Sequence, residues 1–130
     1  MNKALLITAA LLGALSVVIG AFGAHGLKAL ISIDAQQTFE TGVRYQMYHA
    51  LLLLWVGNTT FISQKSKKAI FYLVVFGLVL FSGSIYGLAT NTLTNFNFKS
   101  IGFITPIGGF LLILSWILLL INFLKIKVEK

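Results

Sequence analysis

Four long stretches of apolar residues, separated by short polar segments, run along the chain. The first covers residues 4–24 without a charge, and the second covers residues 43–62 with an arginine and a histidine near its start. The third covers residues 69–89, again uncharged, and the fourth covers residues 104–124. A helix needs about 20 apolar residues to cross the hydrocarbon of a bilayer. The pattern predicts an all-α integral membrane bundle of four transmembrane helices, in one domain over residues 1–130.

The connection between the first two spans is the most polar part of the chain. Asp34 and Gln37 have the spacing of a capping box, which predicts a short amphipathic helix that begins near Ala35 and leads into the second span. At the fourth span, Thr105 is expected to be the N-cap and Pro106 the first helical residue, where its missing N–H costs nothing.

The composition favours lipid as the solvent. Asp, Glu, Lys and Arg make up 10% of the residues, whereas soluble domains average about 25%. Apolar types make up 58%, the net charge is +7 and there is no cysteine. The basic residues lie in the breaks between apolar stretches, not on one folded face, so nucleic-acid binding is not expected. The first apolar stretch is longer than the apolar region of a signal peptide, about 7–15 residues, so we expect it to be retained.

The distribution of basic residues predicts the orientation in the membrane. With four spans, both termini and the loop at residues 63–68 lie on one side. That side carries Lys3, Lys65, Lys67, Lys68, Lys125, Lys127 and Lys130, and the other carries Lys28, Arg44 and Lys99. Positive residues favour the cytoplasmic side, so we expect a multi-pass protein of the cell membrane with cytoplasmic termini. The excess of lysine over arginine favours a bacterial source.

Polar side chains gather near the predicted outer end of the bundle. Glu40 and Arg44 lie four residues apart, in the favourable acid-first order. His49 is predicted about one turn inside the hydrocarbon, where a titratable group is costly unless it is paired. The candidate polar cluster consists of His25, Glu40, Arg44, Tyr45, Tyr48, His49, Ser82, Ser84 and Tyr86. It is either an interfacial anchor or a shallow outward-facing pocket, in which residues from three spans meet at matched depth.

Small residues in the first and third spans predict close helix packing, because helices in lipid associate where their backbones can approach. These residues are Gly13, Ser16, Gly20, Gly83 and Gly87. The alternative for the third span is a polar pathway lined by Ser82, Ser84 and Tyr86.

Four segments together resemble one known family. They read GAFGAHGL at residues 20–27, FETGVRYQMYHA at 39–50, LFSGSIY at 80–86, and ITPIGG at 104–109 followed by SW at 115–116. The family is that of small multi-pass membrane proteins that includes bacterial YgdD-like and YwdK-like proteins and the eukaryotic transmembrane protein 256. The resemblance implies a membrane location and four helices, but no assigned reaction. One departure is the Ser-Ile-Asp at residues 32–34, where the family pattern has a Ser-Pro pair.

Three functions compete on this evidence. The first is a non-enzymatic structural or accessory membrane component, with membrane lipids and either a second copy or another membrane protein as partners. The second is a channel or transporter for protons or small solutes, which requires an oligomer because four helices enclose little space. The third is a cofactor or metal site at His25 and His49. The sequence has no phosphate loop, dinucleotide or metalloprotease motif, so we assign no catalytic residue, cofactor or metal.

Overall fold

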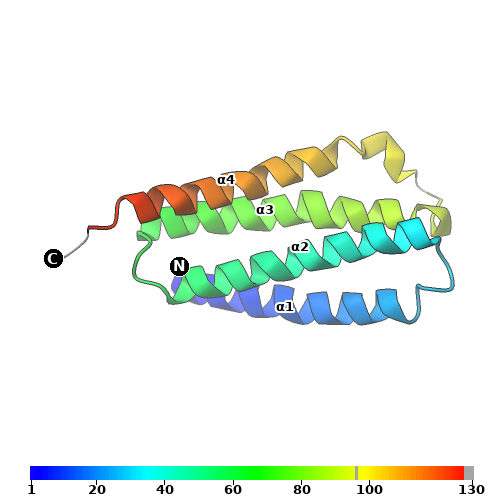
Figure 1. Cartoon of the computed structure of the whole chain (residues 1–130), viewed down its shortest axis with the longest axis horizontal. Coiled ribbons are helices and arrows are strands. Elements are labelled where there is room, and N and C mark those ends of the chain that lie inside the picture. Colours follow the sequence, from blue (N-terminus) through cyan, green and yellow to red (C-terminus); the bar gives the residue numbers. More distant parts are fainter. Residues whose placement is uncertain (96, 128–130) are drawn as a thin grey trace.

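A computed structural model describes residues 1–95 and 97–127. Its four long helices are α1 (Asn2–Ala24), α2 (Ile33–Asn58), α3 (Gln64–Ala89) and α4 (Ile104–Leu124), and the last connection holds the short helices η1 (Asn91–Leu93) and η2 (Phe98–Ile101). The long helices run side by side and alternate in direction along the chain (Figure 1). The start of α1 and the end of α4 therefore lie at the same end of the bundle (Figure 1).

The second and third helices begin earlier than the apolar pattern predicts. Ser32, not Asp34, caps α2, and its hydroxyl accepts a hydrogen bond from the Ala35 backbone N–H at 3.1 Å. The helix continues from there to Asn58, so the predicted separate amphipathic helix is the first part of α2. Ser63 caps α3 in the same way. Polar residues that precede an apolar stretch can also be helical, so hydropathy alone places both helix starts too late.

The fourth helix begins at Ile104, where the apolar stretch begins, so Thr105 is not its N-cap and Pro106 is not its first residue. Phe103 occupies the N-cap position without a side-chain hydrogen bond. The hydroxyl of Thr105 instead lies 2.5 Å from that of Ser84 in α3. Pro106 falls within the first turn, where its missing N–H has no helical partner to lose. The prediction is wrong because Thr105 has a tertiary partner that competes with the local cap.

The helices pack in chain order, with α2 and α3 in the middle and α1 and α4 on the outside (Figure 1). The main core lies toward the end of the bundle that holds Met1. It contains fully buried side chains from three helices: Leu5, Leu53, Val56, Ile70 and Val74. Leu112 and Leu119 of α4 complete it. A smaller apolar cluster of Leu27, Phe39 and Ala89 lies at the other end.

Two of the predicted packing residues of the first span, Gly13 and Gly20, face α2. A Cβ on Gly20 would lie 3.2 Å from Val43, and one on Gly13 would lie 4.0 Å from Ala50. Ser16 is 2% exposed, and its hydroxyl is a buried side-chain atom without a hydrogen-bond partner in the described chain. The first span therefore uses its small residues to bring its backbone close to α2.

The predicted packing residues of the third span do not contact another long helix. A Cβ on Gly83 would meet nothing within 4 Å, and one on Gly87 would overlap the ring of Phe98 in η2. The close approach of α3 to α4 is made instead by Gly77 and Gly108, since a Cβ on Gly108 would lie 2.8 Å from the Gly77 carbonyl oxygen. Gly77 is six residues, about 1.7 turns, from Gly83, so it faces a different side of the helix.

Three of the four long helices, α1, α3 and α4, are long and apolar enough to cross a membrane. Their large side chains face outward, as in Val17 (64% exposed), Phe110 (58%) and Leu124 (76%). The remaining long helix, α2, is as long as α3 but more polar, and it packs against both α1 and α3. Its polar side chains in the middle of the bundle, Gln46 and His49, are covered by neighbouring helices. Asp34, Glu40 and Arg44, nearer the start of α2, are exposed.

Candidate functional site

A single amide side chain, that of Gln46 in α2, links three helices. Its Nε2 donates a hydrogen bond to the Leu12 carbonyl of α1 at 2.9 Å. Its Oε1 accepts one from the Tyr86 hydroxyl of α3 at 2.6 Å. The side chain is 5% exposed. The sequence pattern predicts no role for Gln46, although an amide in the middle of an apolar stretch is itself a signal that a neighbouring helix supplies a partner.

α2 and α3 also contact each other one turn before Gln46, at Gly42. The Ser82 hydroxyl donates to the Gly42 carbonyl at 2.8 Å, and a Cβ on Gly42 would lie 2.8 Å from the Tyr86 ring. The Tyr86 ring also packs on Phe39, with 5.1 Å between centroids. Gly42 therefore allows Tyr86 to lie against the α2 backbone, which directs its hydroxyl onto Gln46.

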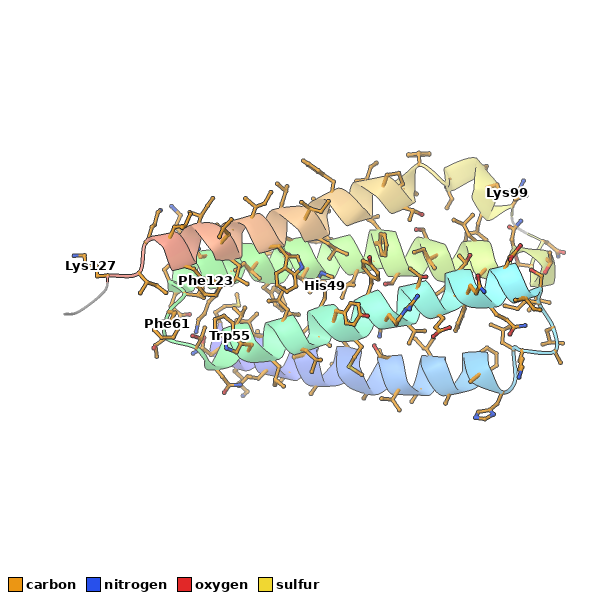
Figure 2. All side chains as sticks on the ribbon, viewed as in Figure 1. His49, Trp55, Phe61, Lys99, Phe123 and Lys127 are labelled. Carbon is orange, nitrogen blue, oxygen red and sulfur yellow. The ribbon has the colours of Figure 1, made fainter. Side chains whose placement is uncertain are left out.

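His49 is buried and bonded at both ring nitrogens. Its Nδ1 lies 2.7 Å from the Tyr45 carbonyl oxygen, and its Nε2 accepts a hydrogen bond from the Trp116 indole of α4 at 3.1 Å. One nitrogen thus donates and the other accepts, which is the pattern of a neutral imidazole. Figure 2 shows His49 near the middle of the bundle, between Lys99 at one end and Lys127 at the other.

Aromatic rings surround the His49 contact on the outer surface of α2. Tyr45 packs on Phe81 of α3 with 4.9 Å between centroids, and Tyr48 lies 5.8 Å from Tyr45. The Trp116 ring meets His49 edge-on at 6.0 Å. Tyr45 and Tyr48 are 39% and 53% exposed, so their rings form part of the outer surface of the bundle. These tyrosines therefore match the anchoring interpretation better than a shared polar pocket.

The remaining predicted cluster residues lie apart. Ser84 faces α4 through Thr105, and its hydroxyl donates to the Phe81 carbonyl at 3.0 Å. His25 is exposed at the C-cap of α1. In the described residues, no three His, Cys, Asp or Glu side chains lie together as a metal site would need. The predicted single pocket is thus divided between the α1–α2–α3 contact, the α2–α4 contact and the bundle end, because α2 and α3 each present several faces to different neighbours.

Glu40 and Arg44 lie beside a cavity at the end of the bundle away from Met1. Arg44 donates to the Thr41 hydroxyl at 3.3 Å. Within residues 1–95 and 97–127, the Glu40 carboxylate has no hydrogen-bond or ion-pair partner. The cavity measures about 410 Å³ and lies between α1 and α2. Its lining residues are Gly20, Gly23, Ala24, Leu27, Ile31, Gln36, Phe39, Glu40, Val43 and Arg44. The expected Glu40–Arg44 pair is therefore not formed, and both charges remain available at the cavity.

A lysine is buried at the opposite end of the bundle. Lys67, in the first turn of α3, is 1% exposed. Its ammonium donates to the Thr59 carbonyl at 2.6 Å and to the Asn2 side-chain oxygen at 2.9 Å. The sequence pattern places Lys67 among solvated loop cations, because nothing in it shows that α3 begins before this residue. The lysine instead connects the start of α1 to the α2–α3 loop.

A protein-family model described as a protein of unknown function, DUF423, matches residues 19–109. The chain is 39% identical over 128 residues to the UPF0382 membrane protein YwdK of Bacillus subtilis, covering 95% of this chain and 98% of that protein. It is 33% identical over 129 residues to the UPF0382 inner membrane protein YgdD of Escherichia coli, covering 97% and 93%.

A third relative, a UPF0382 membrane protein of Staphylococcus saprophyticus, is 40% identical over 124 residues and covers 95% of this chain and 99% of its own length. No solved structure matches the chain. The similarity to YwdK-like and YgdD-like proteins expected from the four sequence motifs is thus confirmed, and the match includes all the residues that line the cavity.

Proposed function

We propose, from the premise that this chain belongs to the DUF423 family of membrane proteins, that it is a non-enzymatic structural or accessory component of a bacterial cell membrane. Its partners on this proposal are membrane lipids and either a second copy or another membrane protein. The observation that carries the proposal is that most buried polar side chains of the described chain, among them Gln46, His49 and Ser82, bond to neighbouring helices. Such bonds are how helices associate in lipid.

His49 is the residue that an enzyme or a metal site would use first, and its bonding favours a structural role. General base catalysis and metal binding both need an imidazole nitrogen with a free lone pair. The accepting nitrogen of His49 is Nε2, and the indole of Trp116 occupies it. Reaction at His49 would therefore require α4 to release this contact, so the arrangement supports helix packing.

A conducting pathway has little support in the single chain. Transport needs polar groups that line a continuous route through the bilayer. The groove between α1 and α3, about 280 Å³, is lined mainly by apolar side chains. Of the polar residues that border it, Gln46 bonds to Leu12 and Tyr86, and Ser82 bonds to Gly42. A route through an oligomer is the remaining form of this alternative, and flux measurements test it directly.

The proposed orientation places both chain ends in the cytoplasm. Met1, the α2–α3 loop and the end of α4 share one end of the bundle (Figure 1). In the described part of the chain, this end carries Lys3, Lys65, Lys67, Lys68, Lys125 and Lys127, and the opposite end carries Lys28, Arg44 and Lys99. The excess of positive residues supports a cytoplasmic position for that end.

Flux across reconstituted vesicles tests the proposal. We expect proteoliposomes loaded with a pH-sensitive dye to show the same proton flux as protein-free vesicles under an imposed pH gradient, because the groove between α1 and α3 is lined mainly by apolar side chains. A protonophore added at the end shows that the gradient was intact. Proton flux that scales with the amount of protein and disappears in His49→Gln would overturn the structural assignment and favour the channel.

A further inference from the structure

The cavity between α1 and α2 has the size and shape of a ligand site. Its volume of about 410 Å³ lies within the range of about 300–1,000 Å³ that is typical of small-molecule pockets. The floor is apolar, and Leu27 and Phe39 are its buried members. Ala24, on the α1 side, is exposed and small, so the cavity stays accessible from outside the bundle.

The rim of this cavity carries two opposite charges that do not neutralise each other. Arg44 uses one of its five N–H donors on the Thr41 hydroxyl. The Glu40 carboxylate has no partner in the described part of the chain. Residues four apart on a helix lie on the same face, one turn from each other. The cavity therefore offers a ligand one anionic and one cationic contact, side by side.

The order of these groups along α2 is set by the direction of the helix. The helix begins at Ile33 at the end of the bundle and runs toward its centre, so Arg44 lies about 6 Å further in than Glu40 at 1.5 Å per residue. The apolar lining lies level with these charges or nearer the bundle end, because Val43 meets Gly20 just before Arg44, and Leu27 and Phe39 lie further out. From the bundle end inward, the cavity thus presents an acid and then a base, with apolar side chains beside them.

A zwitterionic phospholipid presents the complementary charges in the same order, with its ammonium outermost and its phosphate next. We propose that the cavity binds a phospholipid with a primary ammonium headgroup, in which Glu40 accepts from the ammonium and Arg44 donates to the phosphate. Guanidinium and phosphate form paired, charge-assisted hydrogen bonds. The inference uses the membrane location of the family but depends neither on the orientation nor on the absence of catalysis.

Native mass spectrometry of the purified full-length protein, titrated with short-chain lipids, tests this proposal. We expect phosphatidylethanolamine to bind about tenfold more tightly than phosphatidylcholine, whose methylated ammonium cannot donate hydrogen bonds, or phosphatidylglycerol, which lacks the ammonium. Glu40→Gln should remove this preference, and Arg44→Gln should weaken binding of all three lipids. Asp34→Asn is the matched control, because it removes an exposed acid of the same helix that does not line the cavity.

Ala24→Phe provides a second test that leaves both charges in place. The residue is exposed, so a ring should obstruct the cavity without disturbing the helix contacts. Circular dichroism confirms that each variant is helical. The proposal is overturned if the three lipids bind equally, if phosphatidylglycerol binds best, if Glu40→Gln keeps the preference, or if Ala24→Phe binds phosphatidylethanolamine as tightly as the unmodified chain.

Discussion

At the scale of single residues, the Gln46 side chain of α2 bonds to both α1 and α3. Replacing it by methionine keeps its length but removes the bonds to Leu12 and Tyr86. We expect Gln46→Met to lower the free energy of unfolding by about 1–2 kcal/mol and Tyr86→Phe by about 0.6 kcal/mol, the average for hydrogen bonds between membrane helices. Unfolding by sodium dodecyl sulfate in mixed micelles measures both.

The two substitutions should not add, because they remove the same bond. The double variant is expected to be little less stable than Gln46→Met alone. Tyr72→Phe is the control, since Tyr72 is 46% exposed on the same helix as Tyr86 and should lose almost nothing. Full additivity would show that the Tyr86–Gln46 hydrogen bond does not contribute.

Lys67 also joins distant segments, but it does so through a charged group that bonds to the start of α1 and to the α2–α3 loop. We expect Lys67→Met to increase hydrogen exchange about tenfold in the start of α1 and in the loop at residues 59–63, which corresponds to about 1.4 kcal/mol of local opening. Lys68→Met is the control, since Lys68 is exposed in the same turn. Equal exchange in the two variants would contradict a role for Lys67 in joining these segments.

At the scale of helices, the contact between α3 and α4 depends on a glycine whose neighbours are backbone atoms. A Cβ on Gly108 would overlap the Phe81 nitrogen and lie 2.8 Å from the Gly77 carbonyl oxygen. Backbone cannot move aside as a flexible side chain can, so Gly108→Ala should separate the helices and cost about 1–3 kcal/mol, as overpacking does. The same detergent titration measures the loss.

Gly83→Ala is the matched control at this scale. Nothing lies within 4 Å of a Cβ at Gly83, and alanine is the better helix former by about 1 kcal/mol. We therefore expect this variant to be as stable as the unmodified chain or slightly more stable. A loss at Gly83 comparable to that at Gly108 would mean that an additional helix, such as one from a second copy, packs on this face.

At the scale of the whole molecule, the proposed orientation predicts which ends of the bundle are accessible from outside a cell. The chain has no cysteine, so single cysteines report cleanly. We expect a membrane-impermeant maleimide to label Thr92→Cys in intact cells, and to label Lys65→Cys only after the membrane is opened. The reverse pattern would show that the distribution of lysines does not set the orientation.

The apolar pattern of the sequence was sufficient to predict the helices and the membrane. An uncharged stretch of about 20 apolar residues in lipid must satisfy its backbone internally, and a single helix does so. The boundaries of α1 and α4 followed closely from this requirement, whereas the starts of α2 and α3 did not. Both of these helices begin with polar residues that follow the N-caps Ser32 and Ser63. Hydropathy carries no information about such caps.

The partners of the polar side chains were decided only by the tertiary structure. The sequence shows that His49, Ser82 and Tyr86 lie at depth and need partners, but several groups at similar depth can serve. A rotation of a helix by one residue, about 100°, turns a side chain toward a different neighbour. The packing of Gly42 and Gly108 against α3 sets that rotation, which directs Tyr86 to Gln46 and leaves Glu40 and Arg44 beside the cavity without pairing with each other.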